Sequence, residues 1–383
     1  MKEIYVDHNA TTYVRDEVLE AMLPYFTEEF GNASSIYSVG RRAKQAVEEA
    51  RKKVAKAINA KPEEIYFTAS GSEADNLGIR GIAYANIQKG NHIITSKIEH
   101  PAVLNTCKDL EKQGFEITYL NVDEKGFVKL DELRNSITDK TILISIMTAN
   151  NEIGTIQNID EIGKIARFKD VYFHTDSVQA IGNVSIDVKE MNIDSLSMSA
   201  HKFYGPKGIG ALYVKKKVSF NPIITGGHQE KNKRAGTENV PAIVGMGRAI
   251  ELANEELEEY NNKLLELRKY TIDRILNEIE DVKINGDMEK RLSGNINISI
   301  KCVDSAALLL MLDMKGICAS SSSACTSSIL SLSHVLKAIN VPDNLAKGTL
   351  RLSYGKTNTL DDAKIVVDIV KEAVEELRKM NKK

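Results

Sequence analysis

The sequence predicts an α/β protein whose first part is built on a mainly parallel sheet and whose second part forms a smaller domain. Short runs rich in β-branched and aromatic residues alternate with longer amphipathic runs as far as about residue 214. This alternation is typical of parallel sheets covered by helices. From about Glu251, apolar residues recur instead at three- to five-residue steps, which predicts a long amphipathic helix leading into the smaller domain.

Seven strands are expected in the first part, because each run is short and is bounded by polar or turn residues. They cover Glu64–Phe67, His92–Thr95, Phe115–Leu120, Thr141–Met147, Val171–Thr175, Asp194–Met198 and Ala211–Val214. Helical periodicity predicts intervening helices at Glu73–Gln88, Ala102–Gln113 and Ile159–Phe168. Leu257, Leu264 and Ile275 mark the long helix, and a charged amphipathic helix is expected near Asp361–Met380.

The composition is that of a globular protein, and it excludes several function classes. The 383 residues carry 51 Lys+Arg against 53 Asp+Glu, a net charge of −2, so no nucleic-acid partner is expected. We expect no membrane contact and a cytoplasmic location, because no apolar run approaches ~18 residues and the opening does not resemble a signal peptide.

The four cysteines lack disulfide-framework and zinc-site spacing. Cys107, Cys302 and Cys318 are expected to be buried.

Five polar clusters each follow an expected strand. They are Ser70-Gly71-Ser72, Glu99-His100, Asn150-Asn151, Asp176 with Gln179, and Ser199-Ala200-His201-Lys202. Any one of them is compatible with ordinary turn chemistry. Because ligands of an open parallel sheet bind beyond the carboxyl ends of its strands, five clusters at one edge predict a single shared site.

Several of these residues have both a structural and a functional interpretation. Ser70 either caps the following helix or begins a phosphate site at that helix N-terminus. Lys202 is either a solvated charge or an amine that forms Schiff bases. Asp176 either caps a turn or accepts a hydrogen bond from the ring nitrogen of a pyridine cofactor. His100 is either a surface residue or a ring-stacking proton relay. Arg351 is either a paired arginine at the edge of the core or a carboxylate clamp.

Cys325 differs from the other cysteines because it lies in a serine-rich stretch without apolar periodicity. Small neighbours favour an accessible thiol that reacts as thiolate. A structural, buried cysteine is the alternative.

Ten segments match a known family in the same order: Asp7–Thr12, Phe30–Asn32, Ser70–Asn76, Glu99-His100, Asn150–Gly154, His174–Gln179, Ser199–Lys202, Gly205–Gly208, Arg234–Asn239 and Ser323–Ser327. In these segments the chain resembles the pyridoxal-phosphate (PLP) cysteine desulfurases of the NifS/IscS type, within the class V aminotransferase superfamily. The resemblance implies a type I PLP-dependent transferase fold. Its large domain, with a mainly parallel seven-stranded sheet, is expected at residues 16–255. A smaller α+β domain is expected to combine residues 1–15 and 256–383 and to carry the Cys325 loop.

The resemblance also implies roles for individual residues. Lys202 matches the lysine that binds the aldehyde of PLP, and Asp176 matches the partner of the ring nitrogen. Gln179 matches the group that bonds the phenolic oxygen, and His100 matches the residue that stacks on the ring.

Further implied residues hold the phosphate and the substrate. The phosphate set matches Gly71, Ser72, Ser199 and His201, with Thr237 and Arg234 reaching in from a partner subunit of a homodimer. The cofactor- and carboxylate-binding groups match Asn151, Arg351 and Asn32, of which Asn151 serves both.

The implied reaction converts L-cysteine to L-alanine. Lys202 removes the Cα proton, the thiolate of Cys325 attacks the substrate sulfur, and His100 passes the thiol proton on. The persulfide on Cys325 then supplies a sulfur acceptor or an iron–sulfur scaffold. Cys325 is also a candidate ligand of a transient iron–sulfur cluster shared with a partner. The family usually has Gly where this chain has Ser322, which implies a stiffer loop.

Two other functions remain open from the residues. One is a PLP aminotransferase or lyase that does not act on sulfur, with Cys325 incidental. The other is a non-catalytic sulfur or iron–sulfur carrier that uses Cys325 alone. Transfer of an amino group to a ketoacid without release of sulfide would favour the first, and a colourless protein would favour the second.

Overall fold

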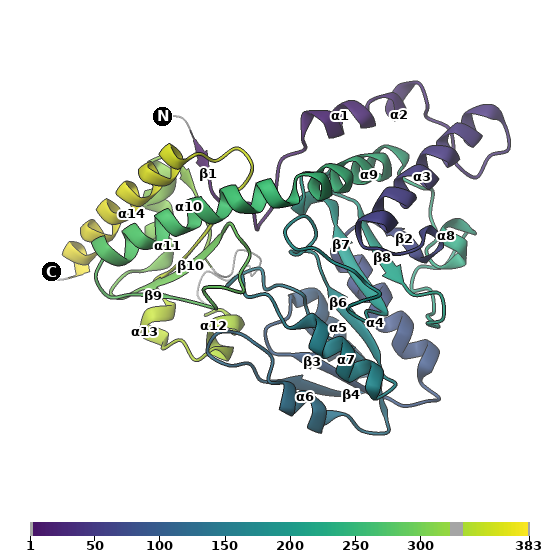
Figure 1. Cartoon of the computed structure of the whole chain (residues 1–383), viewed down its shortest axis with the longest axis horizontal. Coiled ribbons are helices and arrows are strands. Elements are labelled where there is room, and N and C mark those ends of the chain that lie inside the picture. The colour runs from purple at the N-terminus through teal and green to yellow at the C-terminus, as the bar shows by residue number, and fades with distance from the viewer. Residues whose placement is uncertain (1–2, 322–331, 382–383) are drawn as a thin grey trace.

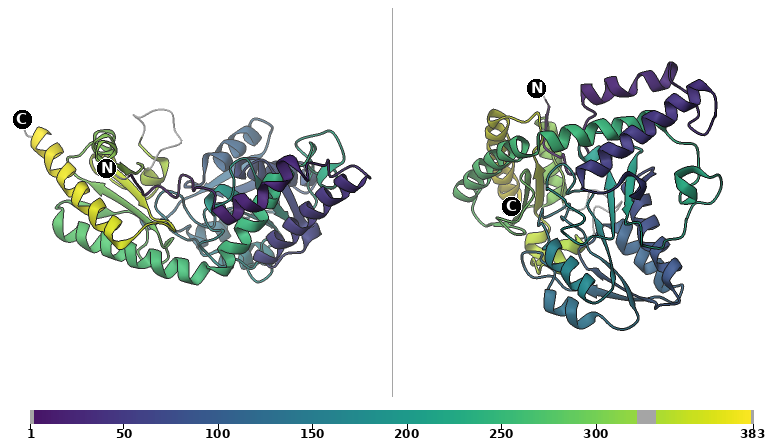
Figure 2. Two further views of the ribbon diagram at one scale, coloured as in Figure 1. Left: turned by 90° about the horizontal axis from the view of Figure 1, so that it is seen from above. Right: turned by 45° about the vertical axis from the view of Figure 1, so that its right-hand side comes forward.

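The computed structural model describes residues 3–321 and 332–381, and these form two lobes joined by long helices (Figures 1 and 2). The larger lobe is built on a seven-stranded sheet. Its strand order is β2 (Ile65–Thr68), β8 (Gly210–Val214), β7 (Ser195–Ser199), β6 (Tyr172–Asp176), β5 (Thr141–Ser145), β3 (His92–Ser96) and β4 (Glu116–Leu120).

Only β8 runs against its neighbours, since it pairs antiparallel with β2 and β7 while the remaining pairs are parallel. The sheet is therefore mainly parallel and seven-stranded, as predicted. Because β2 has the same direction as β7, the carboxyl ends of six strands meet at one edge. That edge is where the five polar clusters follow their strands.

Helices cover both faces of this sheet, which explains why strands such as β3 and β5 are buried along their whole length. Successive residues point to opposite faces. Thus Ile93 packs with α4 (Gly71–Asn86) and α5 (Pro101–Glu111), while Ile94 packs on the other side. The helices of that second face are α3 (Ser38–Ala57), α7 (Ile159–Phe168) and α9 (Val240–Glu255), with the shorter α1 (Asp16–Met22) and α6 (Leu130–Ser136).

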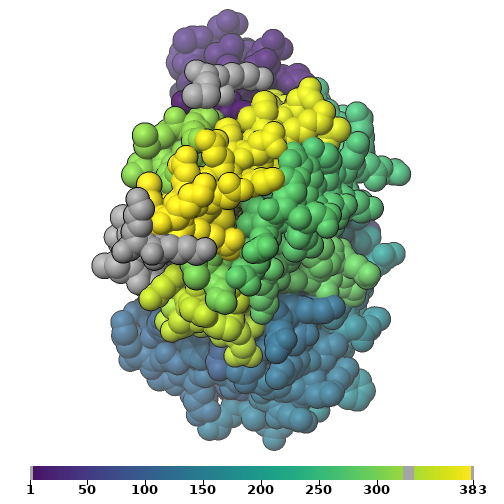
Figure 3. All heavy atoms as spheres, turned by 90° about the vertical axis from the view of Figure 1, so that its left-hand side faces the viewer, coloured from purple at the N-terminus to yellow at the C-terminus, as the bar shows by residue number. Residues whose placement is uncertain are grey.

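The smaller lobe has its own apolar core around an antiparallel sheet of order β12 (Thr349–Ser353), β10 (Asn295–Ile300) and β9 (Val282–Ile284). A parallel pair joins β1 (Ile4–Tyr5) to β11 (Ile317–Cys318). The helices are α10 (Leu257–Glu278), α11 (Ser305–Met314) and α14 (Leu360–Asn381). Helix α14 lies across α10 and α11 and covers one side of this lobe (Figure 3).

The two lobes are tied together in three places. Helix α10 follows α9 after the single residue Glu256, so the long helix expected from Leu257 is present. The N-terminal strand β1 belongs to the smaller lobe, although the chain then crosses to α1 of the larger one. Conversely, α12 (His334–Ala338) and α13 (Asp343–Ala346) pack apolar side chains into the core of the larger lobe. The expected domain boundaries at residues 15/16 and 255/256 remain a prediction.

The remaining short elements are α2 (Pro24–Thr27), α8 (Gln229–Asn232), and the 3-10 turns η1 (Pro62–Glu64) and η2 (Ala200–Lys202). In the described ranges, none of the helices combines the length and the apolar character needed to cross a membrane.

Candidate active site

A cavity of about 680 Å³ opens at the carboxyl edge of the larger sheet, and residues of both lobes line it. The cavity brings together members of all five polar clusters. They are Ser70, Gly71, Ser72, His100, Asn151, Asp176, Gln179, Ser199, His201 and Lys202. From the smaller lobe and its connections come Arg351 and the residues Leu332–His334.

Lys202 is held by the N-terminal segment. It ends the turn η2 directly after β7, and its Nζ donates to the backbone carbonyls of Asn9 and Ala10, the latter at 2.8 Å. The same Asn9 carbonyl accepts from Nε2 of Gln179 at 2.9 Å. The backbone N–H of Asn9 in turn donates to Oγ of Ser353 on β12 at 2.9 Å. The amine therefore sits at a wall that both lobes build.

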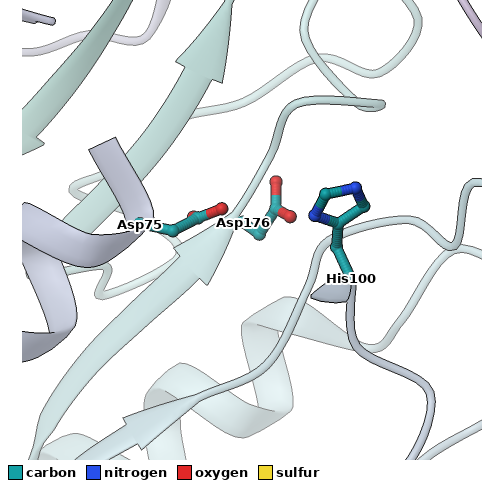
Figure 4. Close-up of side chains that lie close together, drawn as sticks. All are labelled: Asp75, His100 and Asp176. Atoms are coloured by element: carbon teal, nitrogen blue, oxygen red, sulfur yellow. The ribbon is translucent and has the colours of Figure 1, made fainter. Parts of the chain in front are cut away.

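Asp176 and His100 lie next to each other in the cavity (Figure 4). Asp176 is the last residue of β6, is 5% exposed, and accepts from the backbone N–H of Val178 at 2.9 Å. Burial raises the pKa of Asp176, whereas His100 and then Lys202 act in the opposite direction.

His100 caps α5, because its Nδ1 accepts from the backbone N–H of Ala102 at 3.1 Å. Burial lowers the pKa of His100, which keeps the ring neutral, with its proton on Nε2. A neutral imidazole in this position is suited to accept a proton during a reaction.

The N-terminus of α4 also lines the cavity, through Ser70, Gly71 and Ser72. Oγ of Ser70 accepts from the backbone N–H of Glu73 at 3.1 Å, so the capping interpretation is confirmed. Gly71 leaves no room for a side chain, since a Cβ would lie 2.7 Å from Cγ2 of Val178 and 3.3 Å from Cβ of Ser199. Gly71 and Ser72, at the start of this 16-residue helix, line the cavity, and a helix N-terminus is a suitable place for an anion. A phosphate at this position remains a prediction.

Arg351 is an ion-paired arginine at the floor of the cavity. On β12, its Nη2 lies 2.7 Å from Oδ1 of Asp7, and its Nη1 donates to the carbonyl of Asn151 at 3.1 Å. Only 4% of its side chain is exposed, yet it lines the cavity. The paired interpretation is thus correct, and the role as a carboxylate clamp stays a prediction.

Three of the expected site residues, Asn32, Thr237 and Arg234, are not among the residues that line this cavity. Asn32 is exposed, and its Oδ1 accepts from the backbone N–H of Ser34 at 2.9 Å. Thr237 lines a separate cavity of about 170 Å³, and Arg234 pairs with Glu73 at 2.8 Å. Cys325, together with Ser322, lies outside the described residues.

The expectation that the other cysteines are buried holds for one of them. Cys107 on α5 is buried, which raises the pKa of its thiol to about 12. Cys318 on β11 is half-buried. Cys302 is exposed, so its expected burial was wrong. It has a φ of 60° in the connection between β10 and α11, and composition alone does not reveal that a turn falls there.

Several residues at the site had been given no role. Asp7 pairs with Arg351, and the carbonyl of Asn9 accepts from Lys202. Both residues lie near the N-terminus, far from their partners in sequence. The match of the Asp7–Thr12 segment to the family was the sequence feature that pointed to them. Glu99 and Glu152 are buried carboxyl groups, and burial raises their pKa values to about 8 and about 7. Oγ of Ser333 donates to Glu152 at 2.5 Å.

Comparisons with known proteins match this geometry to one family. The family model of class-V aminotransferases matches residues 4–366. The cysteine desulfurase IscS of Clostridium botulinum (strain Hall) is 56% identical over 382 residues, covering 99% of this chain and 96% of the relative. That of Methanosarcina thermophila is 57% identical over 380 residues, covering 99% and 94%. A solved NifS-like protein superposes with a TM-score of 0.92 at 37% identity, covering 98% of this chain and 100% of the other.

The chain belongs to the cysteine desulfurases of the class-V aminotransferase family. Members of this family depend on PLP, and the described residues of this desulfurase fit that cofactor. A buried carboxylate, a lysine, a histidine and the N-terminus of α4 all line the cavity. These match the ring nitrogen, aldehyde, ring face and phosphate of PLP.

Proposed function

We propose that this protein converts L-cysteine to L-alanine and takes the sulfur as a persulfide on Cys325. The observation that carries the proposal is the placement of Lys202, Asp176 and His100 in one cavity with the N-terminus of α4. Membership of the desulfurase family and the names of the relatives favour cysteine as the substrate.

When bound, PLP supplies an aldehyde that condenses with amines and a ring that withdraws electrons from the substrate Cα. With PLP bound, the carboxylate of Asp176 would accept a hydrogen bond from the protonated ring nitrogen and so stabilise the charged ring. Lys202 would hold the aldehyde, and its Nζ, once free, would take the Cα proton. Gln179 and His100 would orient the ring.

The sulfur step needs a thiolate on Cys325. A bond forms between the sulfur of Cys325 and the substrate sulfur, while the substrate bond between sulfur and Cβ breaks and leaves its electron pair on Cβ. Protonation of Cβ gives the methyl group, and return of the proton from Lys202 to Cα completes L-alanine. His100 is the proposed acceptor of the thiol proton of Cys325. Its ring is neutral because burial lowers its pKa, and the proton goes to Nδ1, which must first release the backbone N–H of Ala102.

The described neighbours of the Cys325 segment support this assignment. On one side, Ser320 exchanges backbone hydrogen bonds with Arg351, a lining residue of the cavity, at 2.7 and 3.3 Å. On the other side, Leu332 and Ser333 line the cavity themselves. The described residues that flank this segment, Ser320 and Leu332, therefore lie next to or in the wall of the cavity.

A homodimer is part of the proposal. Thr237 and Arg234 lie away from the cavity of their own chain, which fits the role of completing the phosphate site of a partner subunit. Phe30 and Ile36 are 70% and 89% exposed, and large apolar side chains on a surface favour a protein contact.

A sulfur acceptor or an iron–sulfur scaffold is the proposed further partner. A reducing compartment, the cytoplasm, is the proposed location, and the free thiols of Cys107 and Cys318 fit it.

The test is a sulfide and alanine assay of the purified PLP-loaded protein with L-cysteine and a reductant. Equal amounts of alanine and sulfide are expected. Cys325→Ser should lose at least ~100-fold in sulfide release, because the nucleophile is removed, and Cys302→Ser serves as the matched control. Full activity of Cys325→Ser would refute the persulfide step. Transfer of an amino group to a ketoacid without sulfide would show a sulfur-independent aminotransferase instead.

A further inference from the structure

Asp75 is a buried carboxyl group to which the proposed reaction gives no role. It lies in the second turn of α4, is 1% exposed, and its carboxyl group points toward Asp176 (Figure 4). Oxygens of Asp75 and Asp176 and a ring nitrogen of His100 lie within 4.8 Å of one another. Oδ1 of Asp75 has no hydrogen-bond partner among the described residues.

No cation faces Asp75 from the described elements packed around it. From β7, the hydroxyl of Ser197 donates to it. From β6, Nε2 of His174 lies 3.8 Å away, and burial lowers the pKa of that histidine to about 3, so its ring is neutral. The carboxyl groups of Asp176 and Glu99 act on Asp75 as like charges.

Asp176 is placed differently. It accepts from the backbone N–H of Val178 and faces His100 and Lys202, which favour its ionised form. Two buried carboxyl groups this close do not both ionise, because the second negative charge would be desolvated and repelled. One proton therefore stays with the pair, and the surroundings favour it on Asp75. Burial and Asp176 together raise the pKa of Asp75 well above its usual range.

We propose that Asp75 is a positioning residue for the cofactor: it remains a neutral carboxylic acid beside Asp176, so that the negative charge of the pair lies on Asp176 and faces the cavity. The O–H dipole of Asp75 then stabilises ionised Asp176 and supports its hold on the ring nitrogen. The role of Asp176 toward the ring rests on the function proposed above, whereas the proton on Asp75 does not depend on sulfur chemistry.

The proton on Asp75 is tested by infrared difference spectroscopy of the PLP-loaded protein at pH 7.5, without substrate. The wild type minus Asp75→Asn should contain the C=O band of a protonated carboxylic acid, which shifts in D₂O. Other protonated acids such as Glu99 are present in both proteins and cancel. Absence of this band would overturn the proposal, because Asp75 would then be ionised. The result is the same whether or not the protein releases sulfide.

The effect on the cofactor is tested by titrating the apoprotein with PLP and following its absorbance. Asp75→Asn keeps a neutral hydrogen-bond donor and should bind PLP within about 2-fold of the wild type. Asp75→Leu has a similar branched shape but no polar group, and should weaken PLP binding about 5-fold, because ionised Asp176 loses the stabilising O–H dipole beside it. Circular dichroism checks that both variants fold. Equal binding by Asp75→Leu, or a large loss in Asp75→Asn alone, would contradict the assigned role.

Discussion

Replacing Glu152 by Gln should make the protein more stable at alkaline pH. Glu152 is 5% exposed, and its carboxyl group accepts from Oγ of Ser333 at 2.5 Å. Burial raises the pKa of Glu152 from 4.5 to about 7, against the smaller opposing effects of Ser333 and Arg351. Gln keeps a carbonyl that accepts from Ser333, but it never has to ionise inside the protein.

The direction of the change in stability with pH follows from the proton that Glu152 binds. Between pH 4.5 and 7 the folded protein holds a proton on Glu152 that the unfolded chain releases, so the wild type loses stability as the pH rises through this window. The rise of the pKa from 4.5 to about 7 corresponds to about 3 kcal/mol. Between pH 5 and pH 8, the free energy of unfolding of Glu152→Gln should therefore rise by about 2.5 kcal/mol relative to the wild type.

Urea unfolding of the apoproteins at pH 5 and pH 8 measures this difference. The exposed Glu124→Gln is the matched control, and it should follow the wild type at both pH values. A difference between Glu152→Gln and the wild type that does not change with pH would refute the reasoning, because Glu152 would then ionise as easily in the folded protein as in the unfolded chain.

Two further variants test the proposed binding sites for the substrate carboxylate and for the phosphate of PLP. Arg351→Gln should raise the KM for L-cysteine about 10- to 100-fold with a smaller change in kcat, as expected for a lost charge-assisted contact to the substrate carboxylate. Asp7→Asn is the control, because it keeps the guanidinium of Arg351 that would contact the substrate carboxylate. Equal KM values for the wild type and Arg351→Gln would show that Arg351 does not bind the substrate. Gly71→Ala should destabilise the start of α4 by about 1–3 kcal/mol, because the new methyl group would meet Val178 at 2.7 Å. PLP binding by Gly71→Ala should weaken at least several-fold in an absorbance titration, and unchanged binding would place the phosphate elsewhere.

Local patterns in the sequence were enough to predict the sheet and its functional edge. Strands such as β3 and β5 are buried on both faces, so each reads as a short apolar run with a clear end, and polar residues after that end mark the edge. Ser70 shows the same for helices, because capping involves only residues close in sequence.

Contacts between distant segments could not be predicted in this way. Asn9 meets Lys202 across 193 positions, and Asp7 meets Arg351 across 344. No local pattern of charge or hydropathy specifies such a pair. Cys302 shows that residue type alone does not predict burial. A free cysteine is commonly buried, but the backbone turn that contains Cys302 places it at the surface.

The path of the first dozen residues has a practical consequence. Strand β1 pairs with β11, and the chain then passes along the cavity, where the carbonyls of Asn9 and Ala10 accept from Lys202. Shortening the protein by ten residues would thus remove a β-strand and the two acceptors that orient the reactive amine. Affinity tags and truncations designed for this enzyme are better made elsewhere, since Asn9, Ala10 and Thr11 line the cavity.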